Sequence, residues 1–206
     1  MRKGRSILLN VALGFLTCLF LVGVVSPSFS KTAPTASEQA VIQQSLESNL
    51  AQAKAVLMAQ DSSTAPSTST FKSYVAVLQT KPVVPTPSSN NSFASSGAVL
   101  VGNRFIVRGD YSNLTSSLRD YATDPLNPPN PNITSGIHMH RGEPGKNGPF
   151  QQALTVEPSG DRSGRFRGDY TLTDEQLQAL SAGNLYVDLH TKQNRGGELR
   201  GAFKPF

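Results

Sequence analysis

The sequence LYVDLHTKQNRGGELRGAF (residues 185–203) has the pattern of two β-strands joined by a short connection. Apolar residues alternate with more polar ones in both halves, as in Leu185-Tyr186-Val187-Asp188-Leu189-His190. This period of two is typical of strands that bury one face and leave the other polar. We therefore expect an antiparallel hairpin whose first strand directs Tyr186, Asp188 and His190 to the same side.

The register of this hairpin follows from matching its two apolar faces. Paired residue numbers must have an even sum, and a sum of 388 puts Arg200 opposite Asp188 and Glu198 opposite His190. The result is either an ordinary polar ladder, worth up to about 1 kcal/mol per charge pair, or an arrangement in which Glu198 orients His190 for a metal ion. In both cases we expect histidine protonation below about pH 6.5 to strengthen contacts with the carboxylates.

Strand patterns extend over the whole region from Phe71 to the C-terminus. Proline-rich and glycine-rich turns separate them, and about eight strands result. The sequence thus predicts an all-β domain over residues 71–206, an antiparallel Greek-key or immunoglobulin-like sandwich. The expected strands are 71–79, 97–101, 103–111, 133–140, 151–156, 164–171, 185–190 and 198–203.

Two helices are expected outside the strands. Within residues 31–70, the capping-box pattern Thr35-Ala36-Ser37-Glu38 precedes an apolar periodicity that predicts an amphipathic helix over 37–60, followed by a polar linker. This helix could cover the domain, serve as a stalk, or mediate oligomerisation. A short helix begins after Thr173, which has Gln176 as its capping-box partner, and ends at Gly183.

The stretches GIHMHRGEPGKNGP (136–149), TLTDEQLQALSAGNLYVDLHT (171–191) and GGELRGAF (196–203) together resemble the CHRD domain, a module named from chordin. The earlier segment YVAVLQTKPVVPTPSS (74–89) is similar to the opening strand and proline turn of that family. The resemblance covers roughly residues 71–206. It implies a β-sandwich related to immunoglobulin or superoxide dismutase folds, and it implies no settled activity.

The chain has only three histidines, and all of them lie on polar strand faces. His138 and His140 are two residues apart, so their side chains share a face about 6.5–7 Å apart along the strand. With His190 they form a candidate metal site for copper or zinc, with Asp188 or Glu143 as weaker oxygen ligands. Alternatively, the histidines are structural and brace the loop of residues 143–149 by hydrogen bonds.

The sequence lacks the residues that several classes of protein require for their function. The Gly-x-His-x-His pattern at residues 136–140 is similar to the start of the copper site of Cu/Zn superoxide dismutases, but that family needs further histidines and a disulfide. Neither a Gly-x-Ser-x-Gly elbow nor a phosphate-binding glycine loop is present. Basic blocks and tryptophan are also missing, so nucleic acid is not an expected partner.

The N-terminus has the organisation of a signal peptide over residues 1–30. A basic start precedes the uncharged run Val11–Val25, and Ser28-Phe29-Ser30 follows as a cleavage site. An uncleaved membrane anchor is the alternative, because 7–25 approaches the length of a bilayer span. The leader contains Cys18, the only cysteine, and three of the nineteen basic residues, so the remainder is thiol-free with sixteen basic and fourteen acidic residues. Any metal site there must use nitrogen and oxygen ligands.

These observations favour a secreted or periplasmic β-sandwich module without enzymatic activity, which binds an extracellular or envelope partner or contributes to envelope structure. The alternative is a copper or zinc protein with redox or hydrolytic activity at His138, His140 and His190. A third hypothesis is a scaffold that oligomerises through helix 37–60.

Overall fold

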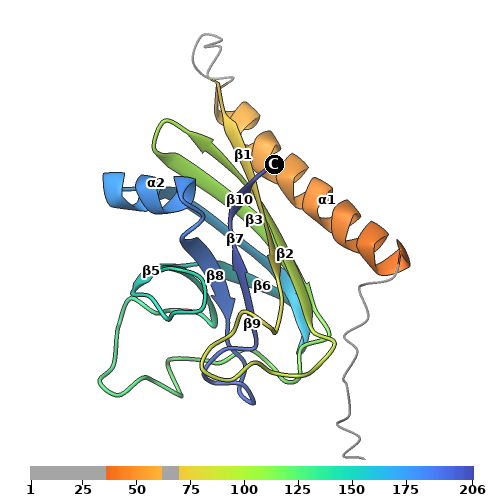
Figure 1. The fold of residues 1–206 in the computed structure, drawn as a ribbon, viewed down its shortest axis with the longest axis vertical. Helices are drawn as coiled ribbons and strands as arrows, with labels where there is room; N and C mark the ends of the chain where they lie inside the picture. Colours follow the sequence, from red (N-terminus) through yellow and green to blue (C-terminus); the bar gives the residue numbers. More distant parts are fainter. Residues whose placement is uncertain (1–35, 62–69) are drawn as a thin grey trace, which may run out of the picture. The chain divides into compact units, whose positions relative to one another are not determined.

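The computed structural model describes residues 36–61 and 70–206, and its dominant feature is a pair of antiparallel β-sheets (Figure 1). The six-stranded sheet has the order β10-β1-β2-β3-β7-β6, and the four-stranded sheet has the order β5-β4-β8-β9. The expected all-β sandwich is therefore confirmed. The strands are β1 (Lys72–Leu78), β2 (Phe93–Val101), β3 (Arg104–Ser112), β4 (Ile137–Arg141), β5 (Phe150–Ala153), β6 (Thr155–Gly160), β7 (Ser163–Thr171), β8 (Leu185–Leu189), β9 (Leu199–Ala202) and β10 (Lys204–Pro205).

The core lies between the two sheets, where the apolar positions of the alternating strands meet. Leu185, Val187 and Leu189 of β8 are fully buried there, as the period of two predicts. Phe105 of the six-stranded sheet packs edge-to-face against Phe203, with ring centroids 5.1 Å apart. Because these apolar faces point inward, the polar residues of β4 and β8 point to the outer side of the four-stranded sheet.

Ten strands replace the eight expected, because one predicted strand divides between the sheets and a further short strand follows the last predicted one. The segment 151–156 forms the end of β5 in the four-stranded sheet and the start of β6 in the six-stranded sheet. The segment 198–203 becomes β9, and the chain then continues into β10 in the other sheet. Leu154 lies at the first crossing, buried, with its N–H donated to Ile137. A third expected strand, 133–140, begins only at Ile137 and extends to Arg141.

The short helix α2 (Asp174–Ser181) begins as its capping box predicts. The Thr173 side chain accepts a hydrogen bond from the Gln176 N–H, and the Gln176 side chain accepts one from the Thr173 N–H. The helix ends at Ala182, and Gly183 then adopts a left-handed φ of 72° that reverses the chain toward β8.

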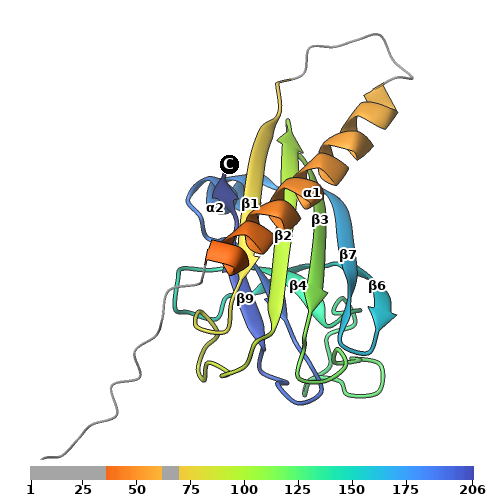
Figure 2. The same ribbon diagram turned by 90° about the vertical axis from the view of Figure 1, so that its right-hand side faces the viewer.

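The long helix α1 (Ala36–Asp61) packs on the outer face of the six-stranded sheet, across β1, β2 and β3 (Figure 2). Leu50, Ala53 and Leu57 form a second apolar cluster with Val99 and Ile106. The helix belongs to the same compact unit as the sandwich. Of the three roles that the sequence leaves open for helix 37–60, this packing matches the covering one. The N-cap candidate Thr35, the leader and most of the linker lie outside the described residues.

Gly97 of β2 provides the closest approach between α1 and the sheet. A Cβ atom at this position would lie 2.3 Å from the backbone nitrogen of Leu50. A polar cluster lies beside this contact, where Asn49 donates to Ser95 and to the Asp110 carboxylate. Neither helix of the described residues is long and apolar enough to cross a bilayer.

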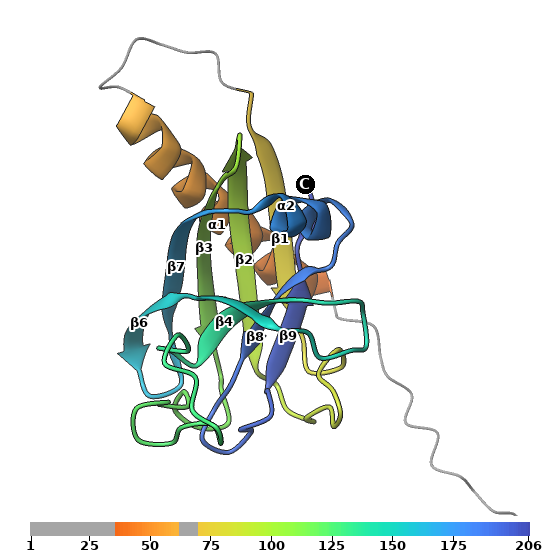
Figure 3. The same cartoon turned by 90° about the vertical axis from the view of Figure 1, so that its left-hand side faces the viewer.

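Three layers result, with the four-stranded sheet outermost on one side, the six-stranded sheet in the middle and α1 on the other side (Figure 3). The two faces of the sandwich therefore differ. Helix α1 lies on the outer face of one sheet, whereas the outer face of the other carries the histidines.

Candidate metal centre

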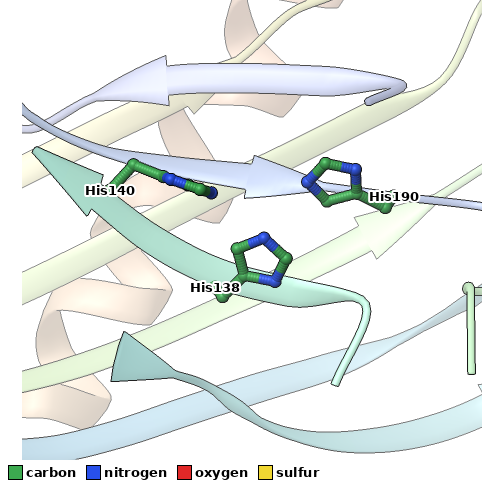
Figure 4. A group of neighbouring side chains, drawn as sticks. All are labelled: His138, His140 and His190. Atoms are coloured by element: carbon green, nitrogen blue, oxygen red, sulfur yellow. The ribbon is translucent and has the colours of Figure 1, made fainter. Parts of the chain in front are cut away.

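The three histidines come together on the outer face of the four-stranded sheet (Figure 4). His138 and His140 lie two residues apart on β4, and His190 directly follows β8. The antiparallel pairing of β4 with β8 puts His138 opposite Asp188. His190, two residues further along, lies on the same face and diagonally across from His138. One ring nitrogen from each histidine lies within 4.8 Å of the others. The shared cluster that the alternation predicts is present.

The rings of the cluster are packed against one another and against aromatic neighbours. His138 stacks on His190 with centroids 4.7 Å apart and an interplanar angle of 16°. Its centroid is also 4.8 Å from that of His140, which in turn stacks on Tyr186 at 5.3 Å. These contacts restrict the rotation of the rings, so the nitrogens are already gathered at one place before any ligand arrives.

Each imidazole is fixed by a hydrogen bond from its Nδ1 to a backbone carbonyl. His138 pairs with Ser135 at 3.1 Å, His140 with Gly148 at 2.9 Å and His190 with Arg195 at 3.0 Å. A carbonyl oxygen can only accept, so Nδ1 must carry the proton in all three rings. In neutral imidazole the Nε2 atom then has an unprotonated lone pair, which is the form that binds metals.

Two of these lone pairs accept no hydrogen bond within the described part of the chain. The Nε2 atoms of His140 and His190 are buried and have no hydrogen-bond partner there. An unsatisfied buried polar atom costs about 1–3 kcal/mol. Such atoms are therefore rare unless water or a ligand satisfies them.

Burial keeps the histidines neutral. Desolvation, followed by the neighbouring His190 and His140, lowers the pKa of His138 to about 3. Desolvation also lowers the pKa of His190 to about 4. The pKa of His140 is lowered for the same reason, although the Asp188 carboxylate, 3.9 Å from its Nε2, opposes this shift. The expectation that protonation near pH 6.5 strengthens carboxylate contacts is therefore wrong, because desolvation outweighs the attraction.

The donor types suit a transition metal, but the rings must reorient to bind one. Metal–nitrogen bonds of about 2.0–2.1 Å hold three donors roughly 3.4 Å apart, which is closer than the 4.8 Å span of the cluster. The stacked rings of His138 and His190 must therefore tilt toward a common point. Neutral imidazoles suit zinc, copper, iron and nickel.

Asp188 and Arg200 face each other across β8 and β9, as the sum of 388 predicts. Arg200 donates to both carboxylate oxygens from Nε and Nη2, each at 2.6 Å. Its guanidinium also lies over the Tyr186 ring, 4.4 Å from the centroid. The weaker candidate Asp188 is thus near the cluster but already neutralised. Glu143, the other weak candidate, pairs with Lys146 on the surface and is not in the three-residue group.

Glu198 does not orient His190. The chain turns at Gly197, where φ is 127°, and β9 starts only at Leu199, so Glu198 is not a strand residue opposite His190. Its carboxylate is fully buried and accepts hydrogen bonds from donors on three other segments, while Arg195 holds the His190 ring. These donors are Ser92, Thr115, Thr191 and Asn194.

Further residues surround the cluster that the sequence did not single out as part of a site. The Tyr121 ring lies 5.8 Å from His138 and 6.3 Å from His190, and Phe150 lies 5.6 Å from His138. The guanidinium of buried Arg119 lies 4.5 Å from the Tyr121 centroid. Alternation along β8 had placed Tyr186 on the face of His190, but Arg119 and Tyr121 come from an irregular segment with no periodic signal.

Comparison with known proteins identifies one family. The family model for the CHRD domain matches residues 74–203, which include all three histidines and both strands of the terminal hairpin. No curated protein and no solved structure matches the chain.

Proposed function

The chain belongs to the CHRD domain family, and on that premise we propose that it is an exported β-sandwich module that binds a transition-metal ion at His138, His140 and His190. Copper and zinc are two of the ions that suit this donor set. The role is one of binding rather than catalysis.

The pair of unsatisfied Nε2 atoms on His140 and His190 carries this proposal. Three Nδ1 protons directed at three carbonyls leave three Nε2 lone pairs available at one place. A hydrogen bond from the second ring nitrogen to a carbonyl is the usual companion of a metal-bound histidine. A purely structural cluster needs the three Nδ1 bonds, but it gains nothing from buried lone pairs without partners.

The location of the protein is part of the proposal. The leader pattern of residues 1–30 favours export to a periplasmic or extracellular space, with membrane anchoring if the leader is retained. Outside the leader the chain has no cysteine. A site built from imidazoles alone does not lose its ligands to thiol oxidation in such an oxidising environment.

Metal analysis of the untagged protein, expressed with its own leader, tests the proposal. We expect about one copper or zinc ion per chain, retained through gel filtration and lost in His138→Gln and His190→Gln. Glu143→Gln is the matched control, because Glu143 is exposed and lies outside the histidine cluster. Metal-free protein whose melting temperature does not respond to added copper or zinc would overturn the proposal.

A second candidate function, the binding of an extracellular or envelope partner by the loop 143–147, is favoured by how firmly this exposed loop is held. Gly148 accepts from His140 and donates to the Tyr186 hydroxyl, and Arg200 donates to Lys146 and Asn147. A pre-ordered loop loses little entropy on binding. Capture of a partner from envelope extracts that is abolished by loop substitutions, but unaffected by chelators, would favour this role over metal binding.

A further inference from the structure

The charges around the three histidines are those of arginines that already have acidic partners. Arg200 takes both oxygens of Asp188. Buried Arg119 pairs with Asp124, whose carboxylate also pairs with the exposed Arg195. Neither carboxylate is left to offset the charge of an ion.

The cluster is also shielded from water. His138 and Asp188 are each 2 % exposed, Arg200 is 6 % exposed and His190 is 8 % exposed. The cost of moving an ion from water into such a site rises with the square of its charge, so a dication costs roughly four times as much as a monocation. Zinc sites offset this cost with thiolates, carboxylates or a bound hydroxide. Here the three donors are neutral.

The number of donors also disfavours a divalent ion. Three nitrogens form the cluster, and the neighbouring carboxylate of Asp188, 3.9 Å from the Nε2 of His140, is bonded to Arg200. The rings of Tyr121 and Phe150 lie against His138 and present aromatic surface. Cu²⁺ favours four or more nitrogen and oxygen ligands in a tetragonal arrangement, and structural Zn²⁺ favours four in a tetrahedron. Cu⁺ carries one positive charge fewer than these two ions and accepts three ligands.

We infer that the three-histidine cluster is a three-coordinate site for monovalent copper, which it binds in preference to Cu²⁺ and Zn²⁺. This inference rests on the proposed function and specifies the ion. The selectivity comes from the neutral donors, the burial and the arginine-paired carboxylates, which together penalise the second positive charge.

Titration of the untagged protein under anaerobic conditions tests the inference. Cu⁺ is titrated against a chromophoric Cu⁺ chelator, and Cu²⁺ and Zn²⁺ are titrated against their own competitors. We expect one Cu⁺ per chain, bound at least 100-fold more tightly than either divalent ion, and no displacement by a tenfold excess of Zn²⁺. X-ray absorption should show three nitrogen neighbours around the copper.

Two kinds of variant test two different points. Histidine variants test whether the site binds Cu⁺, and an Arg200 variant tests what causes its selectivity. His138→Gln and His190→Gln should each weaken Cu⁺ binding at least 100-fold, and Glu143→Gln should leave it unchanged. Arg200→Gln exposes the Asp188 carboxylate to the cluster and should narrow the preference for Cu⁺ over Zn²⁺ at least tenfold. If Arg200→Gln does not fold, the wild-type titrations still decide the matter.

The outcomes distinguish this inference from the proposed function. Stoichiometric Zn²⁺ or Cu²⁺ that resists replacement by Cu⁺ would overturn the preference for the monovalent ion and leave metal binding intact. Failure of all three ions to bind would overturn both.

Discussion

Asp188 on β8 and Arg200 on β9 form a bidentate ion pair beside the histidine cluster, with both carboxylate oxygens 2.6 Å from guanidinium nitrogens. The two side chains are 3 % and 7 % exposed, respectively. Removing one member of a buried pair leaves the other as an uncompensated charge, which typically costs about 3–5 kcal/mol. Loss of one partner therefore lowers the free energy of unfolding strongly, even if the intact pair contributes little net stability.

We expect Asp188→Asn to lower the free energy of unfolding by about 3 kcal/mol, because Arg200 keeps its charge and loses its partner. Urea denaturation followed by circular dichroism measures this loss. The double variant Asp188→Asn with Arg200→Met should recover most of it, since no charge is then left buried. An Asp188→Asn protein as stable as the wild type would show that the ion pair is open to solvent.

The lowered pKa values of the histidines predict that the metal-free protein loses stability on mild acidification. A histidine whose folded pKa is below its unfolded value of about 6.5 contributes fully above pH 6.5 and loses its contribution as the pH falls. The folded pKa is about 4 for His190 and about 3 for His138, so the loss begins below pH 6.5 and continues to about pH 4 for His190 and about pH 3 for His138. The expected slope is about 1.4 kcal/mol per pH unit for each histidine.

Denaturant titrations in the presence of a chelator, from pH 7.5 to 4.5, measure this slope. The stability of His138→Gln should depend less steeply on pH over the same range. A stability that is flat between pH 6.5 and 4.5 would mean that the rings accept protons in the folded state.

Gly97 determines how closely α1 approaches the six-stranded sheet. We expect Gly97→Ala to cost about 1–3 kcal/mol, the usual range for overpacking, because its Cβ would lie 2.3 Å from the backbone nitrogen of Leu50. Limited proteolysis should cut the segment 36–61 faster in this variant. Gly196→Ala is the control, since a Cβ there has no atom within 4 Å. Equal stability of the two variants would argue against the packed position of α1.

Glu198 joins several connecting segments through its carboxylate. Burial raises the pKa of this group, but hydrogen bonds from Ser92, Thr115 and Thr191 outweigh that effect and lower the pKa below its usual value. We expect Glu198→Gln to cost about 2–4 kcal/mol, because an amide nitrogen would face donors and charged hydrogen bonds are worth about 1.5–3 kcal/mol each.

Thermal unfolding of Glu198→Gln, compared with Glu157→Gln, checks this expectation. Glu157 makes an exposed pair with Arg167, and its change should cost less than about 1 kcal/mol. Similar melting temperatures for the two variants would show that the Glu198 cluster is not a stabilising junction.

The sequence alone predicts the parts of the fold that follow from the alternation of polar and apolar residues along a strand. A period of two assigns each residue of a strand to a face, so the shared face of His138 and His140 and the Asp188–Arg200 pairing could be derived before any coordinates. The capping box at Thr173 is equally local, since all its atoms lie within four residues.

Other features depend on contacts between separate segments, which the sequence of a single strand does not specify. Alternation is the same whichever sheet a strand joins, so the division of 151–156 between β5 and β6 leaves no signal in the pattern. The predicted pairing of Glu198 with His190 is not formed, because β8 ends at Leu189 and β9 begins only at Leu199, after the turn at Gly197. Tyr121 contacts the histidines from an irregular segment, where the position of a side chain depends on tertiary contacts such as those of Arg119.

The three carbonyls that accept from the imidazoles belong to three separate connections, at Ser135, Gly148 and Arg195. An ion bound by the opposite ring nitrogens would tie these connections together through the rings, although they are distant in sequence. Hydrogen–deuterium exchange of their backbone amides would then slow in concert on metal loading and quicken in concert on chelation. This part of the four-stranded sheet would thus change its rigidity with metal supply while its strands remained as they are.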